Sequence, residues 1–356
     1  MKIIGVDLHT RQQTIAMLDD QTGELVEKQL NHEGEGVRQF YSALPRPVLV
    51  GIEATGSMFW FLRLLDELAI DFRVGHPAKI RAAEPRKQKN DRRDARLLLR
   101  LLVKNRFPAI WMPSPRLRDL QVLLRHRHRL VRIRTRVQLG LQALALSHGL
   151  RRGSSLWTPG GQHQVRTLPL AQHAATQRET LLTLYPQLQH SIDCLDRQIE
   201  TQVNERPQAR RLMTHPGVGP ITALATEVFL GDPRRFANSK AVASYIGMIP
   251  QEKSSGGRQR FGKLSKQGNA LLRFLWGQAA MQAVRRDPEL LRFYRRKLVQ
   301  KGLGKAMVAA ARKLGIRLWI MLRDEIDYSE FCRRGNLLRQ CGTAYAGMPE
   351  GDSGPR

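Results

Sequence analysis

The sequence predicts an α/β domain followed by two mostly helical regions. Short apolar runs, two of them ending in an acidic residue, fill the first 75 residues, whereas long runs rich in leucine and arginine follow Pro115. Pro108, Pro113 and Pro115 lie between the two patterns and favour a linker there. A chain of 356 residues, 42% of them hydrophobic, is long enough for two or three modest cores.

The N-terminal region is expected to contain three strands, a helix, a strand, a helix and a strand, in that order. The predicted strands are 2–7, 14–18, 25–30, 47–52 and 71–74, and the predicted helices are 34–44 and 56–68. This order is typical of an RNase H-like α/β domain of the kind found in Holliday-junction resolvases. A further helix is expected from Asp91 to about Lys104, with Asn90 as its N-cap.

The rest of the chain is predicted to be helical. Long helices at 116–150 and 168–203, joined by a loop at 151–165, indicate a helical hairpin that forms either a coiled coil or a simple bundle. Shorter helices are expected at 221–230, 240–247, 270–284 and 303–322, with a polar, basic loop at 250–268. The expected domains are therefore 1–115, 116–206 and 207–330, with a disordered tail at 331–356.

The charge balance predicts a polyanionic partner. The net charge is +28, yet residues 1–60 carry five basic and eight acidic side chains, whereas residues 79–136 carry nineteen basic and four acidic ones. Nucleic acid is a better match for such a chain than a membrane surface. Three widely spaced cysteines argue against a zinc site, and no apolar run is long enough to span a bilayer. We expect a cytoplasmic, nucleoid-associated protein.

Four acidic residues are candidates for a metal site. Asp7 and Glu53 end two strands that are expected to be neighbours, so both carboxylates emerge at one edge of the sheet. Asp91 and Asp94 lie three apart on one predicted helix and share a face. Carboxylates that converge repel one another unless cations neutralise them, and two Mg²⁺ ions would do so. Such a pair of ions can assist phosphodiester cleavage. The alternative is a set of unrelated surface acids.

Basic residues surround the acids of the predicted helix. Lys87, Lys89, Arg92 and Arg93 flank Asp91 and could bind phosphates beside a metal site, although a solvated charged helix face is the alternative.

Two glycine-containing segments follow in the C-terminal region. The run from His215 to Pro220 resembles a helix-hairpin-helix turn that binds phosphate, with an ordinary turn between helices as the alternative. The second segment presents Ser254 and Ser255 beside two glycines and favours a phosphate-binding loop. Arg258, Arg260, Lys263 and Lys266 in and after this segment could bind the scissile phosphate.

An ordered set of motifs resembles the insertion-sequence 110 group of DEDD transposases, in particular its 1111 branch. The motifs are Gly5-Val6-Asp7, Glu53-Ala54-Thr55-Gly56, Asn90-Asp91-x-x-Asp94-Ala95, Pro216-Gly217-Val218-Gly219, Tyr245-x-Gly247-x-x-Pro250, Ser255-Gly256 and Ser265-Lys266-x-Gly268-Asn269-x-x-x-Arg273. Asn90 and Met58 depart from the residues common in the group, threonine and an aromatic residue.

The resemblance implies a DNA recombinase. Asp7, Glu53, Asp91 and Asp94 would bind Mg²⁺, and Ser255, which directly precedes glycine as the serine of the group does, would form a covalent link to DNA. The group works as dimers that pair into tetramers, and a non-coding RNA selects donor and target DNA. A metal-dependent junction endonuclease and a non-catalytic nucleic-acid-binding protein are the alternatives.

Overall fold

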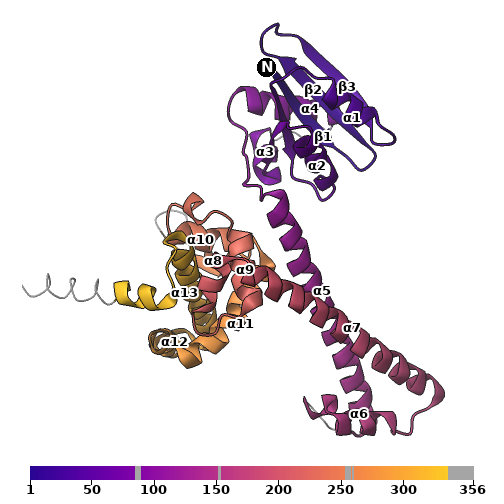
Figure 1. Cartoon of the computed structure of the whole chain (residues 1–356), viewed down its shortest axis with the longest axis vertical. Coiled ribbons are helices and arrows are strands. Elements are labelled where there is room, and N and C mark those ends of the chain that lie inside the picture. Colours follow the sequence, from indigo (N-terminus) through magenta and orange to yellow (C-terminus); the bar gives the residue numbers. More distant parts are fainter. Residues whose placement is uncertain (85–89, 151–153, 253–257, 259, 336–356) are drawn as a thin grey trace, which may run out of the picture. The chain divides into compact units, whose positions relative to one another are not determined.

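The computed structural model describes residues 1–84, 90–150, 154–252, 258 and 260–335. The chain divides into two compact units, Met1–Pro115 and Arg116–Arg356 (Figure 1). The first unit contains β1 (Lys2–Leu8), β2 (Gln12–Asp19), β3 (Leu25–Asn31), α1 (Gly36–Ser42), β4 (Val48–Glu53), α2 (Phe59–Glu67), β5 (Asp71–Gly75), α3 (Pro77–Ala83) and α4 (Asp91–Val103).

The five strands form one mixed sheet in the order β3-β2-β1-β4-β5. β1, β2 and β3 are antiparallel neighbours, whereas β1, β4 and β5 run parallel to one another. Short loops can join the antiparallel strands, but the parallel strands need crossovers, which α1 and α2 provide. The mixed sheet and its covering helices confirm the α/β class predicted for this region.

Side chains alternate between the two faces of this sheet, and each face has its own core. Ile4, Val6 and Leu8 of β1 pack with residues of α1 and α2. Ile3 of β1, on the opposite face, packs with Leu98 and other apolar residues of α4. The face that carries odd-numbered residues of β1 is therefore the face that α4 covers.

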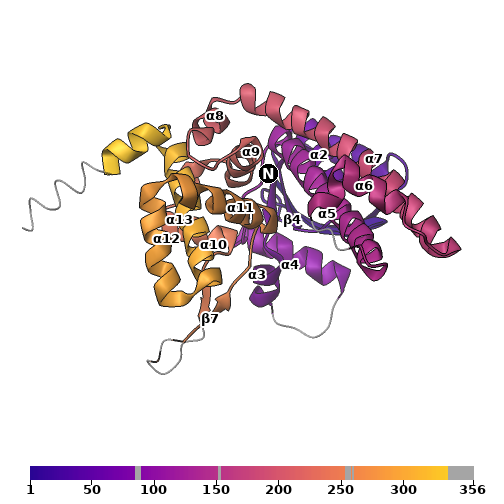
Figure 2. The same ribbon diagram turned by 90° about the horizontal axis from the view of Figure 1, so that it is seen from below.

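The second unit begins with a helical hairpin. Its long helices are α5 (Pro115–Ser147) and α7 (Gln172–Asn204), which lie side by side in Figure 1 and Figure 2. Between them are η1 (Ser154–Trp157) and α6 (Pro159–Arg166). The guanidinium of Arg127 donates to both carboxylate oxygens of Asp196, at 2.7 and 3.0 Å, and Arg134 donates to Gln189 at 2.7 Å. Polar pairs thus fix the position of α7 along α5.

The remaining elements pack around a separate apolar core that includes Trp276 and Trp319. They are α8 (Pro207–Met213), α9 (Pro220–Leu230), η2 (Pro233–Arg235), α10 (Ser239–Ile246), β6 (Pro250–Glu252), β7 (Phe261–Leu264), α11 (Ala270–Arg286), α12 (Pro288–Lys301) and α13 (Leu303–Arg323). Residues 328–335 are also helical. No helix in the described part of the chain combines the length and apolar character that a membrane crossing requires.

The structure corrects several local predictions. The predicted loop 151–165 contains most of α6, which forms because Thr158 caps the helix and Pro159 occupies its first turn. The predicted loop 250–268 contains two strands, and α3 and α12 were not predicted. The predicted tail from 331 begins within a helix; its remainder, 336–356, lies outside the described residues. The structure does not test the domain boundaries proposed at 206 and 330.

Candidate metal site and nucleic-acid-binding residues

Gly5 determines where α4 crosses the sheet. A Cβ at this position would lie within 3.0 Å of the Cα of Leu99 and even closer to the carbonyl oxygen of Ala95, both in the backbone of α4. Only glycine allows a helix backbone to approach the strand so closely. Because Asp7 lies two residues further along the same face, this contact brings the start of α4 toward the end of β1.

The first turn of α4 presents two acidic residues. Its N-cap is Asn90, whose Oδ1 accepts from the N–H of Arg92 at 3.0 Å, as the sequence predicted. Asp91 and Asp94 follow in the first turn. Acidic side chains are favourable there because unpaired N–H groups give the helix start a partial positive charge.

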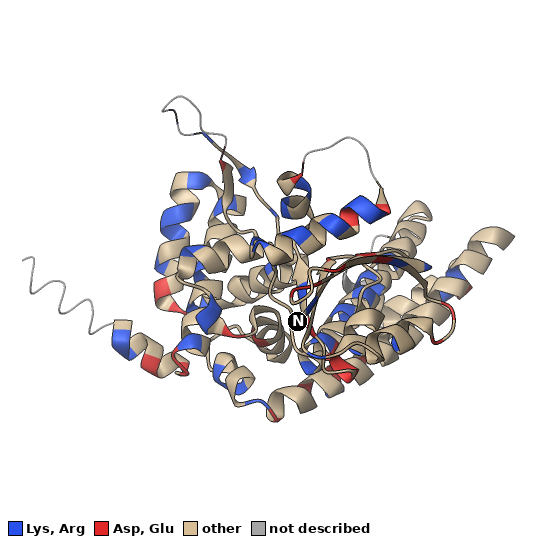
Figure 3. Ribbon diagram, turned by 90° about the horizontal axis from the view of Figure 1, so that it is seen from above, with Lys and Arg blue, Asp and Glu red and all other residues tan. Residues whose placement is uncertain are grey.

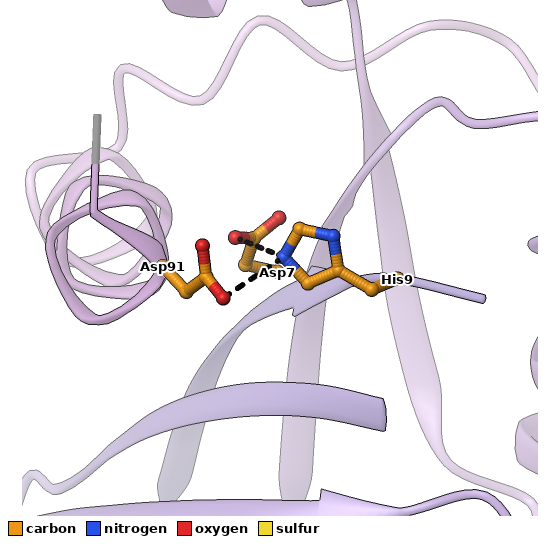
Figure 4. A group of neighbouring side chains, drawn as sticks. All are labelled: Asp7, His9 and Asp91. Atoms are coloured by element: carbon orange, nitrogen blue, oxygen red, sulfur yellow. Dashed lines mark hydrogen bonds and ion pairs between the residues drawn. The ribbon is translucent and has the colours of Figure 1, made fainter. Parts of the chain in front are cut away.

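Asp7, His9 and Asp91 meet at the edge of the sheet. The Nε2 atom of His9 lies 3.1 Å from Oδ2 of Asp7 and 3.3 Å from Oδ2 of Asp91, so the imidazole lies between the two carboxylates (Figure 4). One possible ligand atom from each residue lies within 4.8 Å of the other two. The Asp7 side chain is only 18% exposed, whereas that of Asp91 is 43% exposed. The cluster is thus open to solvent from the helix side.

The pKa of the Asp7 carboxyl is raised above its ordinary value. Burial is the largest cause, and the negative charges of Asp94 and Asp91 raise the pKa further, whereas His9 lowers it by its charge and hydrogen bond. The raised pKa means that ionising Asp7 costs free energy in the folded protein, and a bound cation would lower that cost. Because the donors are carboxylate oxygens and one imidazole nitrogen, the cluster fits a divalent cation.

Glu53 occupies the equivalent end of the neighbouring strand. Val6 of β1 is in register with Ile52 of β4, so Asp7 and Glu53 are the next residues of two adjacent parallel strands. A Cβ at Gly51 would contact Leu102 of α4, and alternation then places Glu53 on the face that α4 covers. Within the described residues, the close group of ligand atoms contains Asp7 and Asp91 but not Glu53 or Asp94.

The basic residues of α4 have different partners. Arg96 forms an ion pair with Glu27, and Arg100 donates to Glu84 at 2.5 Å, so these two hold α4 in place. Arg92 and Arg93 are exposed near the acids, and Figure 3 shows red and blue side by side at the start of this helix.

An open cavity of about 330 Å³ lies beside Asp91 of α4, and Thr14, Asn90 and Arg92 are among the other residues that line it. Lys87 and Lys89 lie outside the described residues.

The C-terminal loop is anchored by residues from the sequence motifs. β6 and β7 pair antiparallel, with Pro250 opposite Leu264. Arg273 donates to the carbonyl oxygen of Ile246 at 2.7 Å, and the N–H of Lys266 donates to the carbonyl oxygen of Gly247 at 3.2 Å. These contacts join the motif that begins at Tyr245, before the strands, to the motif that begins at Ser265, after them. The two motifs therefore hold the two ends of the loop together.

Arg258, Arg260, Lys263 and Lys266 are all exposed on or next to this two-stranded sheet. Ser254 and Ser255 lie outside the described residues, so the predicted nucleophile has no described geometry.

The turn between α8 and α9 packs closely against α11 at Gly217, its first glycine. Gly217 has a φ of 86°, and a Cβ there would lie 2.5 Å from the backbone nitrogen of Ala283 in α11. Val218 is buried, and its N–H donates to the carbonyl oxygen of His215. Close packing against α11 accounts for glycine at 217 without a ligand.

Sequence reasoning missed His9. A histidine two residues after a strand-end acid shares the face of that acid, and this Asp-x-His spacing is the signal that could have identified it.

Two family profiles match the chain. The profile of the transposase IS116/IS110/IS902 family matches residues 209–295, and a profile for the DEDD transposases of IS110, described as a transposase, matches residues 4–148. A "Probable family 20 transposase" of Pseudomonas aeruginosa is 30% identical over 91% of this chain and 98% of its own length. The chain belongs to the IS110 family of transposases.

Other members of the IS110 family are similar over most of the chain. The transposase for insertion sequence element IS1111A of Coxiella burnetii is 25% identical over 78% of this chain and 79% of its own length. The transposase for IS1328 of Yersinia enterocolitica is 25% identical over 92% of this chain and 98% of its own length. As an IS110-family transposase, the chain is expected to cut and rejoin DNA. The profile match over residues 4–148 covers the acidic cluster.

Proposed function

We propose that this transposase moves its own insertion sequence by site-specific recombination that uses two sets of residues. The acidic residues of the first unit bind metal ions, and a serine of the second unit attacks the DNA. The observation that carries the proposal is the convergence of Asp7, His9 and Asp91 at one sheet edge in a chain of a transposase family. The strand order β3-β2-β1-β4-β5 supports an RNase H-like assignment for the first unit.

Asp7, Glu53, Asp91 and Asp94 are the proposed Mg²⁺ ligands, in a site for two ions. Bound there, the ions would neutralise charge that develops on the phosphate oxygens during strand cleavage. Asp7 supplies a rigid, largely buried ligand from the sheet, and Asp91 supplies a more exposed one from α4. The Nε2 atom of His9 lies between these two carboxylates and is proposed as a further ligand of the ion that they bind.

Ser255 is the proposed nucleophile. Its hydroxyl oxygen loses its proton, attacks a backbone phosphorus and forms a phosphoserine bond, while one bridging P–O bond of the DNA breaks. The released DNA oxygen takes up a proton and becomes a hydroxyl. The number of phosphoester bonds is unchanged, so rejoining needs no outside energy source. Arg258, Arg260, Lys263 and Lys266 would bind the phosphates around the cut through their exposed charges. Lys87, Lys89, Arg92 and Arg93 are proposed to bind the backbone near the acids.

Three further features belong to the same proposal. A non-coding guide RNA would select the donor and target DNA. The net charge of +28 is consistent with binding RNA as well as DNA. Dimers would pair into tetramers, and acids and serine from different protomers would form each site. The protein would work in the cytoplasm at the nucleoid.

A covalent-trapping experiment tests the proposal. The full chain is incubated with its guide RNA, Mg²⁺ and DNA that carries the element ends, then denatured and analysed for DNA linked to protein. We expect an adduct with the natural sequence and with Ser254→Ala, and none with Ser255→Ala. Cleavage that survives Ser255→Ala but disappears in Asp7→Asn would instead favour a junction endonuclease. No cleavage under any metal condition would leave a nucleic-acid-binding protein.

A further inference from the structure

Helix α5 is strongly basic and uses few of its basic residues for folding. It contains eight arginines and one acid, Asp119. Arg127 and Arg134 donate to Asp196 and Gln189 of α7 and so hold the hairpin together. These two arginines are seven residues apart, which places them on one face of the helix.

Four other arginines occupy the opposite face of α5. We call them the arginine ridge: Arg125, Arg129, Arg132 and Arg136. Their spacing of four, three and four residues keeps them in one row about 16 Å long. All four are exposed, and none forms a salt bridge with a residue that the structure describes. Arg125 lies over the ring of Phe229 at 5.2 Å, which fixes the N-terminal end of the row.

The ridge is costly for an isolated helix. Like charges three or four residues apart repel by a few tenths of a kcal/mol per pair, and an acid on this face would remove that repulsion. No acid lies among the neighbouring exposed side chains, which include Val122, 62% exposed, and Ile133, 39% exposed. A polyanion that lies along the helix would relieve the repulsion. The row contains no acid that would repel a phosphate.

We propose that the arginine ridge binds the phosphate backbone of duplex DNA. The ridge presents a straight line of planar guanidinium groups, which suit phosphate oxygens and remain charged at any physiological pH. The choice of DNA over RNA rests on the proposed function, because a transposase must hold the duplex on either side of the cut. The inference that the ridge binds phosphates depends only on the spacing and exposure of the arginines of α5.

The test measures how DNA affinity depends on salt. The variant Arg129→Gln/Arg132→Gln/Arg136→Gln is compared with the natural sequence in the full chain, without divalent metal, on a duplex DNA probe between 50 and 200 mM NaCl. If three phosphate contacts are lost, the slope of log affinity against log salt becomes shallower by about 2.7. Over this salt range the natural protein then loses about 40-fold more affinity than the variant.

Two control variants separate a specific surface from bulk charge. Arg63→Gln/Arg166→Gln/Arg197→Gln removes the same charge from other exposed positions and should leave the slope within one unit of the natural value. Arg129→Lys/Arg132→Lys/Arg136→Lys keeps the charge and should keep most of the slope. Unchanged thermal unfolding shows that each variant is folded.

Three results would overturn the proposal. They are an unchanged slope in the ridge variant, an equal change in the control variant, and a change seen only with duplex RNA. Because no cleavage is measured, the outcome is independent of the proposed chemistry: Asp7→Asn should lose cleavage and keep the full slope.

Discussion

Gly5 of β1 lies directly against the backbone of Ala95 in α4, with no space for a side chain between strand and helix. This contact determines how the first turn of α4 approaches the end of the sheet. Asp91, one turn before Ala95, consequently reaches the imidazole of His9. The candidate metal site thus depends on a residue that carries no functional group.

Replacing Gly5 by alanine is therefore expected to disrupt the site and destabilise the first unit. The added methyl group must push α4 away from β1, and overpacking of this kind costs about 1–3 kcal/mol or more when backbone has to move. Thermal unfolding should show a lower midpoint. Gly36→Ala is the matched control, since a Cβ there meets no atom within 4 Å. Equal stability of the two variants would contradict the expectation.

His9 is expected to coordinate a metal ion directly. Imidazole is a common ligand of Mn²⁺ and an uncommon one of Mg²⁺, so Mn²⁺ is the appropriate probe. Pulsed electron paramagnetic resonance of the Mn²⁺-loaded protein should detect coupling to a ¹⁴N nucleus. His9→Gln should abolish this coupling and weaken Mn²⁺ binding about tenfold or more.

His76→Gln, which changes an exposed histidine of the same unit, should leave the nitrogen coupling intact. Coupling that is absent from the natural protein would mean that the carboxylates bind the ion without His9.

Asp7→Asn is expected to lower DNA cleavage without lowering the stability of the fold. The carboxyl of Asp7 has a raised pKa, mainly because it is buried, so its ionised form is disfavoured in the folded protein. A neutral amide of the same shape removes that cost, and the midpoint of thermal unfolding without metal should stay level or rise. DNA cleavage should fall by more than about 100-fold, because a lost metal ligand costs several kcal/mol of transition-state stabilisation.

The control for this change is Asp71→Asn, which neutralises an exposed acid of β5 and should retain cleavage. A marked loss of stability in Asp7→Asn would instead assign Asp7 a structural role.

The second unit is expected to lose stability in mild acid. Burial lowers the pKa of His215 to about 4, against an ordinary value of 6.5, so the folded protein keeps this imidazole neutral. As the pH falls below 6.5, the unfolded chain takes up the proton first. The stabilisation is therefore complete above pH 6.5 and is lost toward pH 4, by up to about 3 kcal/mol.

Hydrogen exchange of α11 and α13 at pH 7, 5.5 and 4.5 measures this effect. His215→Phe should flatten the pH dependence, although it also loses the hydrogen bond of Nδ1 to Pro216. His173→Phe, at an exposed position, should leave the pH dependence as it is. A dependence that persists in His215→Phe would point to Asp287, which accepts from Arg317.

Much of the local structure was predictable because it depends on neighbours in the sequence. The apolar runs that end at Asp7 and Glu53 predicted strands, and the capping role of Asn90 followed from its place before Asp91. The parallel register of β1 and β4 then carried Asp7 and Glu53 to the same edge, as expected from their position at strand ends. The role of Ser255 stays a prediction.

The sequence by itself determined the α/β and helical regions, the strong positive charge and the position of the acids at the ends of elements. Only the tertiary structure decided which side chains meet. It placed His9 between Asp7 and Asp91, assigned Arg127 to the hairpin and left Arg129 exposed. The physical reason is that the formation of a helix or strand depends on local backbone preference and periodicity. A contact between side chains of two different elements depends instead on how closely the two backbones pack. Gly5 controls that distance for α4, and no local pattern in the sequence states what it packs against.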